Sequence, residues 1–140
     1  MFFQNISFLT VFISAIVSMG LGFAWYSPFL FGKRWIKETG NTEESLKSTT
    51  SKQGMIRTYT AGTILSVVTA YLLAVIFNSI VFVSLGGMIT AALVLWLGFM
   101  VPVMMNSVLY GKDSITLFFI NSGYQLVSLI LMALIIGIFG

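Results

Sequence analysis

The sequence contains neither cysteine nor histidine, and the two absences narrow the chemistry open to it. Without cysteine there is no disulfide, no thiolate nucleophile and no thiolate metal ligand. Histidine, which is absent too, is the side chain most often used as a general base and as a metal ligand. We therefore expect no cofactor and no metal site, and we expect that the protein is not an enzyme.

Charged residues are scarce as well, and their scarcity determines the class of protein. Only 8% of the 140 residues are charged, whereas 58% are hydrophobic. A typical soluble domain has about 25% charged residues. Lipid must therefore surround most of this chain. With only 7 Lys and Arg and a net charge of +3, the composition does not indicate binding to nucleic acid.

Long stretches without charge define the membrane spans. Residues 1–32 and 58–111 contain no charged side chain. Because roughly 20 helical residues cross a bilayer, the second stretch is about twice too long for one crossing and must turn back. Asn78-Ser79 is the expected break, and Gly86-Gly87 is the alternative. The sequence predicts an all-α fold, a four-helix transmembrane bundle forming a single domain over 1–140, with spans at about 6–26, 58–77, 80–105 and 115–139.

The basic residues lie almost entirely in one loop, at about 33–57. This loop holds all of them except Lys112, which lies between the third and fourth predicted spans. Cytoplasmic loops of membrane proteins are enriched in Lys and Arg. The pattern therefore predicts that both charged loops are cytoplasmic and that both termini are outside. The middle of the first loop, 39–51, is rich in Ser, Thr and Glu and is expected to be weakly ordered.

Small residues recur at four-residue spacing in every predicted span. Such stripes let helix backbones approach closely in lipid. We expect them to pack helices within the chain, although one stripe could instead form a homo-oligomer interface. A short similarity between 21–33 and 97–112 raises the further alternative of two parallel helical-hairpin repeats. The stripes are Ser14/Ser18/Gly22, Gly62/Ser66/Ala70/Ala74, Gly86/Thr90 with Gly87/Ala91, and Ala133/Gly137.

Polar and aromatic side chains gather towards the expected cytoplasmic ends of three spans. One interpretation is structural, because Trp and Tyr favour the membrane interface and amides form hydrogen bonds between helices. The other is a pocket open to the cytoplasm for a neutral, cationic or lipid-like ligand. Pro28 and Pro102 are expected to shape helix ends or kinks. The candidate ligand-binding residues are Trp25, Tyr26, Asn106, Asn121, Tyr124 and Gln125.

A cationic segment begins the first loop. Lys33, Arg34 and Lys37 surround the apolar pair Trp35-Ile36 at the predicted inner membrane surface. Juxtamembrane cations are attracted to anionic lipid by about 1 kcal/mol each. The three cations are therefore either topology anchors or a binding site for a lipid headgroup.

Two groups of motifs resemble those of a known family. The first runs through Gly22–Pro28, Leu30–Lys33 and Trp35. The second comprises Trp96–Phe99, Pro102, Val108–Tyr110, Leu117-Phe118, Ile120-Asn121, Gly123-Tyr124 and Leu126-Val127. Both are similar to a family of small prokaryotic four-span membrane proteins catalogued as a domain of unknown function. The resemblance implies a four-span fold and a prokaryotic cytoplasmic (inner) membrane, and it brings no established activity.

The predicted spans contain no ionisable Asp, Glu, Lys, Arg or His. Proton-coupled pumps and many ion-coupled transporters need such a group within the membrane. We therefore expect an oligomeric bundle that binds or passively moves a small or lipid-like ligand. The alternative is a structural or accessory protein that acts through a membrane partner or anionic lipids.

Overall fold

The computed structural model describes residues 6–39, 52–79 and 84–139. Within these residues four helices are long and apolar enough to cross a membrane, which confirms the predicted all-α, four-span fold. They are α1 (Phe8–Trp25), α4 (Lys52–Asn78), a third span built from α5 (Leu85–Leu95), η1 (Trp96–Met100) and α6 (Val101–Leu109), and α7 (Ile115–Phe139). A short helix, α2 (Gly32–Thr39), follows α1.

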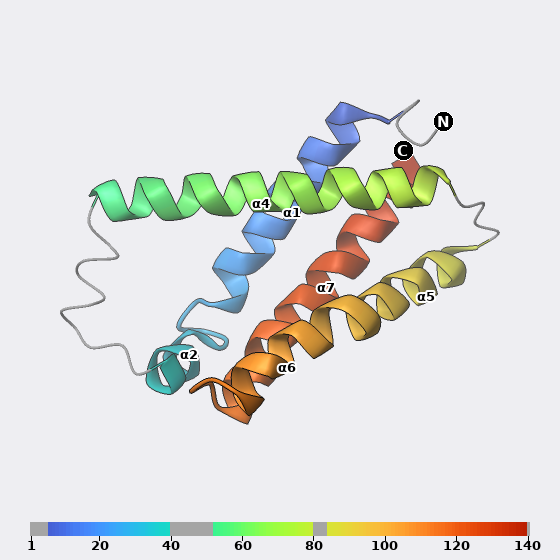
Figure 1. Ribbon diagram of the computed structural model, residues 1–140. Coiled ribbons are helices and arrows are strands. Elements are labelled where there is room, and N and C mark those ends of the chain that lie inside the picture. The colour runs from blue at the N-terminus through green and yellow to red at the C-terminus, as the bar shows by residue number, and fades with distance from the viewer. Residues whose placement is uncertain (1–5, 40–51, 80–83, 140) are drawn as a thin grey trace.

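Helix α7 is the centre of the bundle. It contacts α1, α2, α4 and the third span, and it lies between α1 and the α5–α6 helix, while α4 crosses α1 obliquely (Figure 1). The buried core joins Leu129, Met132 and Ala133 of α7 to Ala70 and Leu73 of α4. Small side chains at these contacts allow the helices to approach closely, which is how helices associate in lipid.

The two ends of the bundle differ in character. At one end the start of α1 meets the end of α7, where the Thr10 hydroxyl donates to the Phe139 carbonyl at 3.5 Å. At the other end α2 lies beside the turn that precedes α7 (Figure 1). The cationic segment of α2 and the Lys112 turn therefore share one end, and the start of α1 and the end of α7 share the other.

The third span is interrupted by a π-helical turn, η1. Val101 N–H donates to the Trp96 carbonyl, five residues back. Pro102 explains the extra residue, because proline lacks an N–H and its ring clashes with the carbonyl four positions earlier. The helix accommodates Pro102 in this way and continues to Leu109, whereas the sequence led us to expect a span over 80–105.

Other predicted boundaries can be placed directly. Helix α4 ends at Asn78, the expected turning point, and residues 80–83 lie outside the described part of the chain. Of the segment expected to be weakly ordered, 40–51 lies outside it too, while Thr39 is the last residue of α2. Pro28 lies in the turn between α1 and α2.

Most small-residue stripes face inward. Ser18 lies against Ser128, and a Cβ on Gly137 would overlap the Met88 sulfur. Ala70 and Ala133 are fully buried. The Gly86/Thr90 stripe is different, because both residues are exposed. The proposed duplication into two hairpins stays a prediction.

Candidate functional site

The end of α1 is joined to α7 by two aromatic donors. Trp25 is the last residue of α1, and its indole Nε1 donates to the Ile120 carbonyl at 2.9 Å. Tyr26, the next residue, donates its hydroxyl to Asn121 Oδ1 at 2.7 Å. Successive residues at the end of one helix thus bind successive positions on the other, which fixes the register between α1 and α7.

Tyr124 extends this contact one turn deeper into the bundle. Its hydroxyl donates to the Ser18 carbonyl at 2.9 Å, and its ring packs edge-on against Tyr26 with centroids 5.5 Å apart. The Ser18 hydroxyl lies 3.2 Å from the Tyr124 hydroxyl and 2.6 Å from that of Ser128. The result is a layer between the two helices in which two groups of hydrogen bonds are joined by the packing of Tyr26 on Tyr124.

Two glycines provide the space for these aromatic rings. A Cβ on Gly22 would lie 3.2 Å from the Tyr124 hydroxyl. A Cβ on Gly123 would lie 3.1 Å from Trp25 Cζ2. Both contacts are tighter than ordinary packing allows, so a larger residue would push the ring away from its hydrogen-bond acceptor. The sequence signal was present in the Ser14/Ser18/Gly22 stripe, but its aromatic partners could not be assigned from the sequence.

The structure brings Trp25, Tyr26, Asn121 and Tyr124 together and leaves two other candidates apart. Asn106 is exposed on α6. Gln125 is half-buried on α7. No hydrogen bond of either carboxamide is found to the residues that the structure describes. The three aromatic donors bind backbone carbonyls and the Asn121 amide oxygen. Gln125 is thus a half-buried carboxamide at the edge of this region without a hydrogen bond to the described residues.

A tight turn carries the chain from this layer into α2. Phe31 N–H donates to the Trp25 carbonyl at 3.0 Å, and Gly32 N–H donates to the Ser27 carbonyl at 2.9 Å. A Cβ on Gly32 would overlap the Tyr26 carbonyl, so this position requires glycine. The turn places the Trp35 ring edge-on to Tyr26, with centroids 5.8 Å apart.

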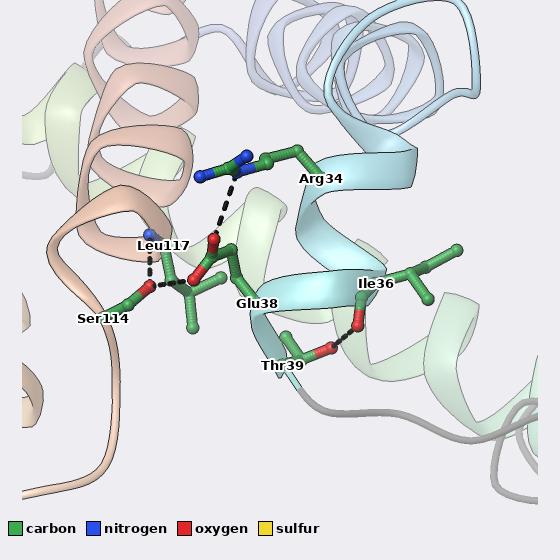
Figure 2. Close-up of polar contacts among 6 residues, drawn as sticks. All are labelled: Arg34, Ile36, Glu38, Thr39, Ser114 and Leu117. Atoms are coloured by element: carbon green, nitrogen blue, oxygen red, sulfur yellow. Dashed lines mark hydrogen bonds and ion pairs between the residues drawn. The ribbon is translucent and has the colours of Figure 1, made fainter.

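A carboxylate ties α2 to the start of α7, as Figure 2 shows. The Ser114 hydroxyl caps α7 by accepting from Leu117 N–H at 3.1 Å, and it donates to Glu38 Oε2 at 2.6 Å. Arg34 Nε lies 3.1 Å from the other oxygen, Glu38 Oε1. The Glu38 side chain is 16% exposed and that of Arg34 54%. The negative charge also lies at the positive end of the α7 dipole, which favours it.

Two further cations of α2 lie on the side next to Arg34 and Glu38. Lys33 and Lys37 are exposed, while Trp35 and Ile36 are half-buried. Neither lysine has an ion-pair partner among residues 6–39, 52–79 and 84–139. Helix α2 is therefore amphipathic, with Trp35 and Glu38 in contact with the bundle and both lysines exposed. Across the same described ranges, no group of three or more acidic, His or Cys side chains that could hold a metal ion is found.

Comparison with known proteins agrees with this architecture. Residues 9–137 match the family described as "Protein of unknown function (DUF1761)", and the chain belongs to that family. No curated protein and no solved structure matches the chain. The chain is thus a small membrane protein from a family without an assigned activity.

Proposed function

We propose that this protein is a membrane-embedded lipid-binding protein that acts as an oligomer and holds anionic lipid headgroups against α2. The observation that carries the proposal is the orientation of α2. Its carboxylate Glu38 binds the cap of α7, and its lysines Lys33 and Lys37 remain exposed. The proposal places α2 at the cytoplasmic face of a cytoplasmic membrane and assigns no catalytic step to the chain.

Electrostatics and position both support a headgroup site. Helix α2 directly follows a membrane span, so its lysines lie at headgroup depth. Ile36, half-buried on the same helix, adds an apolar anchor of the kind found in interfacial helices, while Trp35 packs on Tyr26. Because the Ser114 hydroxyl binds the Glu38 carboxylate, the negative charge of Glu38 is directed towards the bundle and away from the exposed amines of Lys33 and Lys37. A rigidly held helix loses little conformational entropy when a lipid binds.

The experiment is a lipid titration of the full-length protein followed by native mass spectrometry. Phosphatidylglycerol is compared with phosphatidylcholine as the added lipid. The double variant Lys33→Gln/Lys37→Gln should lose roughly thirtyfold in affinity for the anionic lipid, at about 1 kcal/mol per cation. Arg57→Gln is the matched control, because Arg57 is an exposed cation beside another span. Equal losses in both variants, or none in either, would refute a site on α2.

A second candidate function is the binding or passive movement of a small neutral ligand, and Gln125 favours it. A carboxamide within a membrane span ordinarily finds a hydrogen-bond partner, because lipid offers none. Gln125 lies one residue from Tyr124, at the edge of the hydrogen-bonded layer. If this function holds, the Gln125→Leu variant should show no solute flux into liposomes, and its melting temperature should be unchanged. Unchanged flux would exclude Gln125 as the ligand contact.

A further inference from the structure

The third span takes little part in the packing of its own chain. Within the described residues, 6% of an 18-residue apolar stretch of this span is buried, compared with 33% of the corresponding stretch of α7. One side of α5 and α6 faces α7, and the other side has no neighbour in the described chain (Figure 1). Lipid alone can cover an apolar helix face, so low burial does not by itself indicate a partner.

The backbone at η1 does indicate one. In an α-helix the Leu97 carbonyl would accept from Val101 N–H, but that group donates to Trp96. In a π-helix its donor would be residue 102, which is a proline without an N–H. The Leu97 carbonyl therefore lacks both helical donors. It lies near the middle of Leu85–Leu109, where the hydrocarbon core contains no donor of its own.

The residues next to this carbonyl are exposed. Leu97 is 63% exposed, and Pro102 is exposed as well. A Cβ built on Gly98 would meet no atom within 4 Å. Irregular backbone at membrane depth is tolerated where protein or a water-filled cavity covers it, and not where lipid does. Lipid offers the Leu97 carbonyl no donor, so a closely packed helix that brings even weak donors is a better neighbour than lipid for this face of η1.

We propose that this face, formed by Leu97, Gly98 and Pro102, binds the same face of a second copy of the chain. A second copy inserted in the same direction has its η1 at the same depth, and a two-fold axis along the membrane normal brings the two faces together. Gly98 permits close approach of the backbones, as small residues do at other membrane interfaces. The Leu97 carbonyl then accepts weak Cα–H hydrogen bonds from the partner's Gly98.

Asn106 supports the same two-fold arrangement. Its carboxamide is exposed and lies about two helical turns beyond Gly98. A carboxamide has both donors and an acceptor, so it can pair with the partner's Asn106 across the axis. The inference deepens the oligomeric part of the proposed function and rests on that part alone. The lipid titration of α2 tests the rest separately.

The test uses two glycines that each have open space where a side chain would stand. Gly98→Leu adds bulk to the proposed interface, and Gly20→Leu adds it to α1, where a Cβ likewise meets nothing within 4 Å. Native mass spectrometry of the full-length protein from nanodiscs should show a dimer for the unaltered chain and for Gly20→Leu. The Gly98→Leu variant should dimerise with an affinity lower by about tenfold or more, and its melting temperature should be unchanged. An unaltered chain that is monomeric, or a Gly98→Leu variant that dimerises normally, overturns the proposal.

Two further measurements keep the proposal independent of that single variant. The chain has no cysteine, so Leu97→Cys and Leu65→Cys introduce single thiols, at similarly exposed positions on different helices. Oxidation in native membranes should crosslink Leu97→Cys and not Leu65→Cys; equal crosslinking overturns the proposal. Pro102→Ala restores the missing N–H, so this variant should dimerise more weakly. If it dimerises as strongly as the unaltered chain, the Leu97 carbonyl is not the reason for dimerisation.

Discussion

At the scale of single residues, the junction between α1 and α7 depends on hydrogen bonds that can be removed one at a time. Tyr26 and Asn121 form the most direct of these, hydroxyl to amide oxygen at 2.7 Å. Its neighbours, the indole of Trp25 and the phenol of Tyr124, bind backbone carbonyls, so no substitution removes their acceptors. Tyr26 and Asn121 are therefore the pair suited to a double-mutant cycle.

We expect Tyr26→Phe and Asn121→Ala to be coupled by about 0.6 kcal/mol, and by no more than about 1.7 kcal/mol, as hydrogen bonds between membrane helices are. The free energy of unfolding is measured for both single variants and the double variant by denaturant titration in detergent. Ser107→Ala is the control and should leave the free energy of unfolding unchanged, because Ser107 is an exposed serine on α6, away from this junction. Additive losses at Tyr26 and Asn121 would mean that their bond contributes nothing to stability.

Gly32 is the residue at which steric demand is strongest. A Cβ there would overlap the Tyr26 carbonyl and lie 2.7 Å from the Ser27 carbonyl, and neither backbone atom can move freely. Gly32→Ala should therefore lower the free energy of unfolding by about 2 kcal/mol, within the range of overpacked sites. Thermal unfolding followed by tryptophan fluorescence measures the change.

The control for this prediction is Gly20→Ala, on the exposed side of α1 with nothing within 4 Å of its Cβ. Alanine is favoured over glycine inside a helix by about 0.5–1 kcal/mol, so Gly20→Ala should be neutral or mildly stabilising. If Gly32→Ala behaved like Gly20→Ala, the turn before α2 would have to be looser than the hydrogen bonds of Gly32 and Phe31 indicate.

Asn106 shows why the candidate site could be predicted only in part. The spacing of Asn121 and Tyr124 on an unbroken helix puts them on one face, and that face lies beside α1. Asn106 follows a π turn, and one inserted residue rotates every later side chain by roughly 100°. The spacing of apolar residues does not reveal that insertion, although its cause, Pro102, can be seen in the sequence. Asn106 consequently lies outside the layer in which we expected it.

At the scale of elements, α2 is a short helix whose position depends on another helix. Residues 33–37 were expected to mark the start of a cytoplasmic loop, and the structure makes them part of an amphipathic helix. Eight residues are too few for a stable isolated helix in water, so tertiary contact must hold it. The bond from Ser114 to Glu38 is such a contact, and it joins residues 76 positions apart. Sequence periodicity cannot reveal a pairing of that separation.

Ser114→Ala tests this dependence. The variant loses the cap of α7, which is worth about 1 kcal/mol, and it leaves Glu38 with Arg34 as its partner. We expect faster amide hydrogen exchange across α2 and the first turn of α7, measured by mass spectrometry. Ser107→Ala is the matched control, because Ser107 is an exposed serine near the end of α6. Unchanged exchange in α2 would show that Trp35 and Ile36 hold the helix without the polar contact.

At the scale of the whole molecule, the number of spans could be read from charge spacing, but the arrangement of the helices could not. Stretches without charge fix where a chain can cross lipid, because each ionised side chain is costly there. Which helices touch depends on small residues, and every span has them. The central place of α7 follows from its pairing with α1 through Ser128 and Tyr124 on one side and with Trp96 through the Ser122 carbonyl on another.

The orientation of the molecule decides whether α2 can meet cytoplasmic anionic lipid. All seven basic residues lie in the two loops predicted to be cytoplasmic, and the positive-inside rule predicts that both termini are outside. Because the chain has no cysteine, single thiols at Ser79 and Lys112 report the two sides, and both positions are exposed. In intact cells a membrane-impermeant maleimide should label Ser79→Cys. It should label Lys112→Cys only after the membrane has been permeabilised. The reverse pattern would place α2 outside, where the proposed cytoplasmic lipid site could not operate.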